Sequence, residues 1–160
     1  MESFSYKFPR MQPDAVYTSV ITKDGDLTLP EECLSNKPIS EDDSFVLTNS
    51  LEDGIICLYS MQDFDDIRKN LDKLNSMDLN ARRLKRRVVG EAVTVRINGR
   101  VINLLSEYLV KLGFDPDQED GNNQTDFPVM LLKYLNRIEI TSSAVYETII
   151  EELQNQQQDE

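Results

Sequence analysis

The sequence predicts an α+β fold in which two tandem repeats share one β-rich core. One observation is the length: 160 residues, 39% of them apolar, suit one ordinary domain or two small ones. A second is that short runs rich in β-branched and aromatic residues are separated by turn residues. The third is that the order strand, turn, strand, short helix, strand, strand, helix occurs twice. Each copy has about 58 residues, too few to bury much core alone.

The first repeat begins with a β-hairpin. Residues 17–22 are rich in β-branched side chains, and Asp24-Gly25 is a strong turn signal because both residue types tolerate positive φ. Pro30 and the two glutamates after it open a short helix, since proline suits the first turn and acids complement the helix dipole. The returning strand, a loop and a second pair of strands complete this part: residues 27–29, 35–43, 44–48 and 55–59.

Two helices are expected after the second strand pair. Ser60 caps the first, with Asp63 in the place of a capping-box acid, and apolar residues at helical spacing predict one buried stripe. Asp78 or Asn80 caps the next helix, which runs to about Val88 and turns its arginines outward. The inward residues are expected to be Phe64, Ile67, Leu71 and Leu74 in the first helix and Ala81, Leu84 and Val88 in the second.

The same pattern then begins again. Asn98-Gly99 is the second hairpin turn, Ser106 caps a short helix that Gly113 stops, and Ser142 caps a last helix. The expected strands are 91–96, 101–104, 128–132 and 137–140, with an acidic loop at 115–126 and an apolar stripe of Tyr146, Ile149, Ile150 and Leu153 in the last helix.

The two repeats can be aligned on each other. Gly25 falls on Gly99 at an offset of 74, and Ser60 falls on Ser142 at an offset of 82. We therefore expect a flexible N-terminal arm, a first repeat, a basic connecting helix, a second repeat and a polar tail: residues 1–14, 15–78, 79–88, 89–153 and 154–160.

The charge is distributed very unevenly along the chain. The net charge is −12, which by itself argues against binding nucleic acid, whose phosphates need cations. Residues 82–100, however, contain seven basic residues and one acid, Glu91, a net charge of +6. The other 141 residues carry −18. Because the local field depends on such clustering, the acidity of the whole chain does not exclude DNA from one basic face.

Several classes of function are excluded or disfavoured. The chain has no histidine, so a histidine general base or histidine metal ligand is impossible. No apolar run is long enough to span a membrane, and the N-terminus lacks the apolar region of a signal peptide. Cys33 and Cys57 are expected to be reduced, buried thiols of a cytosolic protein. The acids of 115–126 lack the spacing of a calcium loop. We expect no enzyme activity, no metal and no cofactor.

Five motifs follow one another along the chain: Ile56-Cys-Leu-Tyr59, Phe64 with its helix, Leu74-Asn-Ser-Met77, Ala81-Arg-Arg83 and Val89-Gly-Glu-Ala92. In this order they resemble the MraZ family of bacterial transcriptional regulators. The resemblance covers roughly residues 17–153. It implies two tandem AbrB-like swapped-hairpin units, assembly into a ring or other homo-oligomer, and location in the cytoplasm at the nucleoid. It also implies regulation of a cell-division and cell-wall operon.

The DNA-reading motif of that family is Asp-x-x-x-Arg, once per repeat at the first hairpin turn, and both copies are altered here. In residues 22–26, Thr22 replaces the Asp and Asp26 stands where the Arg should be. In residues 96–100, Arg96 replaces the Asp but Arg100 is kept. The resemblance therefore implies DNA contacts by Arg100, Arg96 and Lys23, presented on turns formed by Asp24, Gly25, Asn98 and Gly99.

Two functional hypotheses stay open. In the first, the chain is a DNA-binding regulator, and linked weak contacts from several copies supply affinity. In the second, the chain keeps the fold and the assembly but has lost sequence-specific reading, and acts as an oligomeric interaction protein. The basic helix suits either, because it can contact DNA or acidic surfaces of neighbouring subunits through Arg82, Arg83, Arg86 and Arg87.

Overall fold

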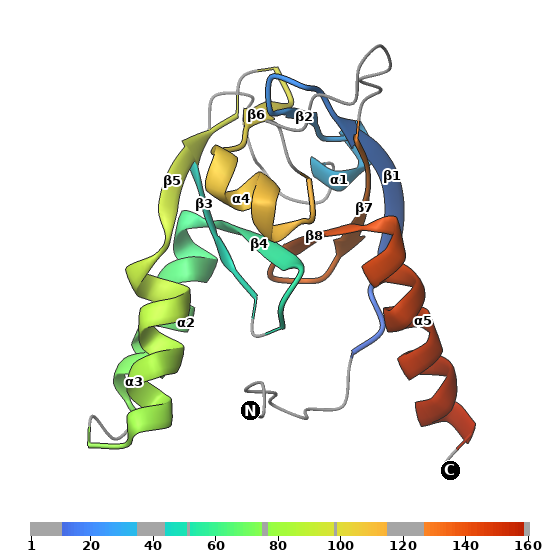
Figure 1. The fold of residues 1–160 in the computed structure, drawn as a ribbon. Helices are drawn as coiled ribbons and strands as arrows, with labels where there is room; N and C mark the ends of the chain where they lie inside the picture. The colour runs from blue at the N-terminus through green and yellow to red at the C-terminus, as the bar shows by residue number, and fades with distance from the viewer. Residues whose placement is uncertain are drawn as a thin grey trace.

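The computed structural model is a mixed α+β fold around a nearly closed antiparallel sheet (Figure 1). It describes residues 11–34, 44–50, 52–74, 77–97, 99–114 and 127–158. The strands are β1 (Ala15–Ile21), β2 (Asp26–Thr28), β3 (Ser44–Asn49), β4 (Ile55–Ser60), β5 (Val93–Arg96), β6 (Val101–Asn103), β7 (Phe127–Lys133) and β8 (Ile138–Ser142). The helices are α1 (Glu31–Leu34), α2 (Met61–Asp72), α3 (Leu79–Lys85), the π-helix η1 (Arg86–Gly90), α4 (Ser106–Lys111) and α5 (Ser143–Gln158).

The sheet is two-fold symmetric in its strand order. The order is β5-β3-β4-β8-β7-β1-β2-β6. If β1 to β4 of the first half correspond to β5 to β8 of the second, the pairing of β1 with β7 corresponds to the pairing of β5 with β3. Strand β4 pairs with its counterpart β8, with Cys57 opposite Glu139, and β2 pairs with its counterpart β6. Strands of the two halves therefore pair with each other within one sheet.

One large core is shared by the two halves. Strands β1 to β4 supply residues such as Ile21 and Leu58, and the second half supplies others such as Ile102, Leu131 and Ile140, all packed in the same cluster. Helix α4 closes onto this cluster with Tyr108 and Leu109, which are both buried. The expectation of one shared β-rich core is confirmed. A smaller cluster lies where Ile149 of α5 packs on β7.

The molecule has two distinct ends. The β1–β2 and β5–β6 turns lie together at the top of Figure 1, which we call the loop end. Helices α2 and α3 form a helical hairpin that projects from the opposite end, the helix end, on one side of the barrel. Helix α5 projects from the helix end on the other side of the barrel (Figure 1).

Most helix boundaries follow the expected caps. The Ser60 Oγ accepts from the N–H of Asp63 at 3.1 Å, and the Ser142 Oγ accepts from the N–H of Val145 at 3.3 Å. Asp78, not Asn80, caps α3 through its carboxylate. The expected cap at Ser106 is wrong, because α4 begins there after Leu105 and has no side-chain cap. Helix α5 also extends to Gln158, through the segment expected to be a polar tail.

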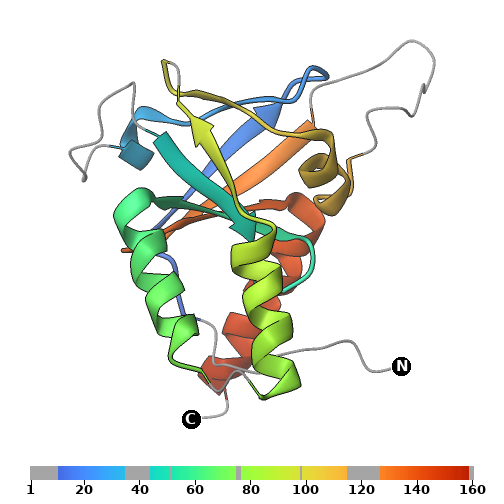
Figure 2. The same ribbon diagram turned by 90° about the vertical axis from the view of Figure 1, so that its left-hand side faces the viewer.

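The buried stripe expected along α2 is wrong. No residue of α2 is buried, and Leu74 just beyond it is 42% exposed. Phe64 is only half-buried and contacts the ring of Tyr59 at 6.1 Å between centroids. The reason is the position of the helix: α2 projects beyond the barrel (Figure 2), so its apolar side covers α3 and the barrel rim and does not enter the core.

Some expectations fall outside the described residues. These are Asn98, the loops at 35–43 and 115–126, and residues 1–10 of the N-terminal arm. Among the described residues, no helix combines the length and the apolar character that crossing a membrane requires.

Candidate nucleic-acid interface

The first hairpin turn is held by its own backbone and by β6. The N–H of Gly25 donates to the carbonyl of Thr22 at 2.9 Å, and the N–H of Leu104 donates to the carbonyl of Gly25 at 2.8 Å. Gly25 has φ +87°, and a Cβ added there would lie 2.8 Å from the Leu104 carbonyl oxygen. Glycine is therefore required at this position, while Lys23 and Asp24 stay exposed at the tip.

The second hairpin turn is held in the matching way by β2. The N–H of Leu29 donates to the carbonyl of Arg100 at 2.7 Å, and Ile97 anchors the other side of the turn in the core. Arg96 and Arg100 are both exposed, and neither forms an ion pair with another described residue. Arg100 has φ +71°, the single positive φ found outside glycine in the described part of the chain.

The strand register corrects the alignment of the two turns. Leu27 pairs with Ile102, which lies 75 residues later in the chain. The same offset of 75, and not 74, relates the hydrogen bond from Leu29 to Arg100 to the hydrogen bond from Leu104 to Gly25. The structural counterpart of Gly25 is therefore Arg100, and not Gly99 as the sequence alignment placed it. An arginine thus occupies, in one half, the left-handed position that the other half fills with glycine.

The charges at the loop end are mixed. Asp26 is held by the side chain of Asn103, whose Nδ2 donates to its carboxylate at 2.9 Å and to the carbonyl of Asp24 at 3.2 Å. The first hairpin therefore presents one lysine beside two aspartates, and the second presents Arg96 and Arg100. An aspartate at a turn repels phosphate, whereas an arginine can hold a phosphate or a guanine edge with two bonds. Of the two turns, the second is therefore the one whose charge suits an anionic ligand.

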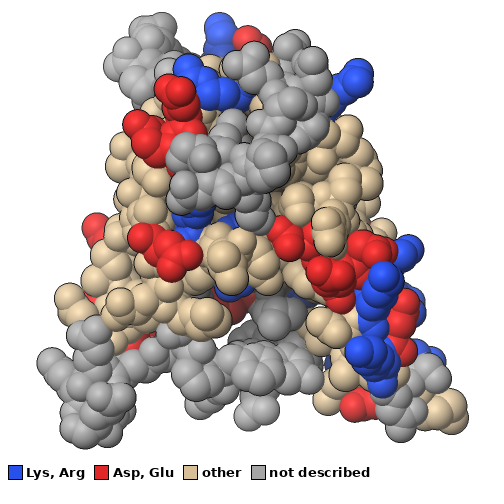
Figure 3. All heavy atoms as spheres, turned by 180° about the vertical axis from the view of Figure 1, so that it is seen from behind, with Lys and Arg blue, Asp and Glu red and all other residues tan. Residues whose placement is uncertain are grey.

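The basic segment is divided between the two ends of the molecule. Arg82, Arg83 and Arg86 are exposed on α3 and η1 at the helix end, far from Arg96 and Arg100 at the loop end. The back view (Figure 3) shows basic side chains at both ends, with acidic ones close beside them on the helical hairpin. The structure therefore does not gather the seven cations into one DNA-binding face.

Arg87 belongs to neither surface, which corrects its assignment to an outward basic face. Its guanidinium Nη1 lies 3.0 Å from Asp53, and its Nε donates to the carbonyl of Ser50 at 2.6 Å. Its side chain is 28% exposed, so it joins η1 to the β3–β4 loop. Lys85 is likewise paired with Asp72 of α2, a contact within the helical hairpin.

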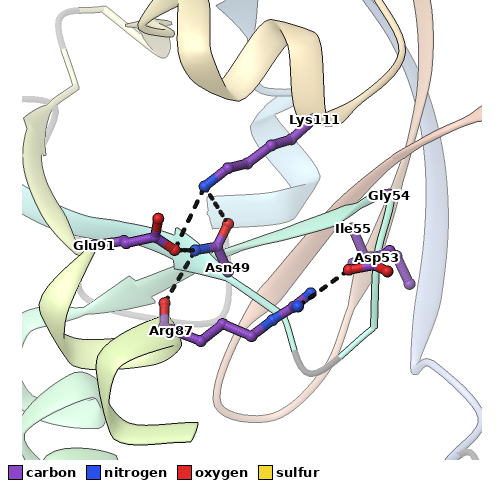
Figure 4. Close-up of a pocket in the computed structure, with 7 residues that line it drawn as sticks. All are labelled: Asn49, Asp53, Gly54, Ile55, Arg87, Glu91 and Lys111. Atoms are coloured by element: carbon purple, nitrogen blue, oxygen red, sulfur yellow. Dashed lines mark hydrogen bonds and ion pairs between the residues drawn. The ribbon is translucent and has the colours of Figure 1, made fainter. Parts of the chain in front are cut away.

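Arg87 lines a hollow of about 300 Å³ that is closed by a polar network (Figure 4). Asn49 lies at its centre: its Nδ2 donates to the carbonyl of Arg87 and to Glu91, and its Oδ1 accepts from Lys111 of α4 at 2.8 Å. Glu91 and Lys111 are also an ion pair at 3.7 Å. Arg87 and Lys111 are each already paired with an acid of the same chain. The polar network therefore connects η1, β3 and α4, and we call it the brace.

The same brace supports the π-helix. Thr48 is fully buried and donates its hydroxyl to the carbonyl of Val88, and the Tyr108 hydroxyl donates to the carbonyl of Glu91 at 2.5 Å. These carbonyls lie where the helical hairpin re-enters the barrel, so their bonds fix how the hairpin projects. Sequence reasoning missed this brace, since its partners come from segments about 40 to 60 residues apart.

The two thiols have the buried setting expected of them. Burial raises the pKa of Cys57 to about 12 and that of Cys33 to about 11, so both thiols stay protonated and unreactive near neutral pH. Within the ranges that the structure describes, no group of three or more acidic or thiol side chains could hold a metal ion.

Comparison of the sequence with protein-family models and with curated proteins finds no match.

Proposed function

We propose that the chain is a MraZ-like DNA-binding transcriptional regulator that works as a homo-oligomer, with DNA contacts made by the second hairpin turn. The proposal rests on the resemblance of residues 17–153 to that family and on the setting of one residue, Arg100. The same resemblance places the protein in the bacterial cytoplasm at the nucleoid, acting on a cell-division and cell-wall operon.

The backbone conformation of Arg100 is the observation that carries the proposal. Its φ of +71° is a conformation that costs an ordinary residue roughly 1–2 kcal/mol, and its counterpart in the other half is a glycine. Strain of this kind is retained in proteins mainly at functional positions. The carbonyl of Arg100 is fixed to β2 while its side chain is exposed, so the guanidinium is presented outward from a rigid base.

Arg96 supplies a second cation from the same turn. It ends β5 opposite Ser44 and is exposed, and Lys23 lies across the loop end on the first turn. Two or three cations per chain give only weak binding, because each phosphate contact adds a modest electrostatic increment. Several copies on one DNA would multiply these contacts, which is why the proposal includes a homo-oligomer.

The test is DNA binding by wild type and Arg100→Ala. The probe is a labelled duplex from upstream of the chain's own coding sequence, titrated at low and physiological salt. Loss of one arginine contact per chain should weaken binding by about 1–3 kcal/mol, roughly 5- to 150-fold. Arg68→Ala, an exposed arginine of α2 outside the loop end, is the matched control and should bind like wild type. No binding by the wild type at low salt would refute the proposal.

A second candidate function is supported by the first hairpin. Asp26 occupies the place of the family's arginine, and its carboxylate accepts a hydrogen bond from Asn103. This turn therefore disfavours contact with phosphate. If both turns have lost DNA reading, the chain is an oligomeric interaction protein with the same fold. A wild type that binds no DNA at low salt but has a mass above that of a single chain would favour this candidate.

A further inference from the structure

The helical hairpin presents a basic surface whose arginines pair with none of the acids in the described part of the chain. Residues 79–90, which form α3 and η1, contain five basic residues and no acid. Lys85 and Arg87 are paired within the chain, whereas Arg82, Arg83 and Arg86 are exposed and form no ion pair with another described residue. We call these three arginines the basic helix face.

Exposed apolar side chains lie on the same helical hairpin. Leu79, at the start of α3, is 51% exposed, and Leu74, before the turn between the helices, is 42% exposed. Met61 at the start of α2 is 52% exposed. One exposed apolar side chain is ordinary, but several on one projecting element that also carries exposed arginines indicate a contact surface.

Helix α5 has the opposite character. It contains three glutamates and no basic residue, and all three are exposed: Glu147, Glu151 and Glu152. We call them the acidic helix face. Ile149 is buried against β7, whereas Ile150 on the next position is only half-buried, so apolar surface accompanies the acids here too.

The helices that carry these two surfaces lie on opposite sides of the molecule, both at the helix end (Figure 1). We propose that the basic helix face of one copy docks on the acidic helix face of the next copy, in a head-to-tail contact. Opposite charge and neighbouring apolar surface make the two faces complementary to each other. Each face would repel a second face of its own kind, so a symmetric pairing of like faces is disfavoured.

A head-to-tail contact has a further consequence. After two copies join, one basic and one acidic helix face remain open, so association continues from copy to copy until it closes on itself. The loop end lies at the opposite end of the barrel and stays accessible in every copy. The inference thus names the contact that the homo-oligomer of the proposed function would use, but it does not depend on DNA binding.

Charge reversal on each face tests the contact. In Arg82→Glu/Arg83→Glu both faces are acidic, and in Glu147→Arg/Glu151→Arg both are basic. Each variant alone should fall to the single-chain mass of 18.4 kDa in light scattering, because like faces now meet. An equimolar mixture should recover the wild-type mass, since the acidic faces of one variant meet the basic faces of the other.

The matched control is Arg96→Glu/Arg100→Glu at the loop end. It also reverses two arginine charges, so its net charge is −16, as in the first variant, against −12 in the wild type. It should keep the wild-type mass while DNA binding is lost. Each variant should fold like the wild type, because none of the substituted side chains is buried. Circular dichroism checks this.

Three results would overturn the contact: a wild type of single-chain mass, reversed variants that keep the wild-type mass, or a mixture that stays at single-chain mass. The proposed function fails separately. If the mixture reassembles but the wild type binds no DNA, the contact stands and the DNA-binding proposal falls.

Discussion

Replacing Arg100 with glycine should make the protein more stable and a weaker DNA binder. A non-glycine residue in the left-handed region, here at φ +71°, costs roughly 1–2 kcal/mol. Glycine removes this cost but gives the unfolded chain more freedom, which costs about 0.5–1 kcal/mol. The expected gain is about 0.5–1 kcal/mol of unfolding free energy. For a domain of this size the midpoint should rise by roughly 1–4 °C.

Arg100→Ala separates strain from chemistry. Alanine keeps the Cβ, so it should keep the strain, and its stability should lie within about 0.5 kcal/mol of the wild type. Both variants lack the guanidinium and should lose DNA affinity equally, by the roughly 5- to 150-fold expected for one arginine contact per chain.

The assays are thermal and urea unfolding, and fluorescence anisotropy with the labelled upstream duplex over a range of salt. If Arg100→Gly is no more stable than Arg100→Ala, the argument from backbone strain is refuted. If both variants bind DNA like the wild type, the arginine is not held at this position for DNA contact, whatever the stability shows.

Two further predictions concern backbone geometry and pH. Gly25→Ala should destabilise the protein by about 1–3 kcal/mol or more in urea unfolding, because the new Cβ meets both a φ of +87° and a carbonyl oxygen 2.8 Å away. Gly99→Ala is the matched control: its φ is +58°, but its Cβ meets nothing within 4 Å, so a smaller loss is expected. For Cys57, burial and then Glu139 raise the pKa to about 12, so the folded state favours the protonated thiol. This contribution should be complete below about pH 8.5 and lost as the pH rises toward 12. Relative to Cys57→Ala, the wild type should lose about 1–2 kcal/mol between pH 7 and pH 10; equal losses in both would contradict the assignment.

The local elements could be predicted from the sequence because their signals are local. Gly25, Ser60 and Ser142 mark a turn and two caps whose partners lie within three or four residues. The shared core also followed, since a repeat too short for its own core must share one. The loop-end arginines were singled out by the resemblance to the MraZ motif, on a turn that Asn98-Gly99 marks.

What could not be predicted depends on contacts far apart in the chain. The apolar spacing of α2 indicates an amphipathic helix but not whether barrel or solvent lies beside it, so Leu74 was wrongly expected to be buried. Arg87 was grouped with the outward arginines because its partners, Ser50 and Asp53, come from a distant loop. The offset of 75 between the hairpins needed the register of β2 on β6.

The structure changes what the charge of the chain means for function. The +6 segment does not form one surface: two cations serve the brace and the helical hairpin, three form the basic helix face, and Arg96 and Arg100 remain at the loop end. Under the proposed function, two arginines on a chain of net charge −12 would hold DNA only weakly and lose it as salt rises. If assembly uses the basic helix face, it brings several such arginine pairs to one DNA molecule, and linked weak contacts then give useful affinity. In that case the acidic excess that disfavours DNA would also supply, through α5, the partner for the arginines of α3. The same charge imbalance would then weaken each single DNA contact and favour the assembly that multiplies such contacts.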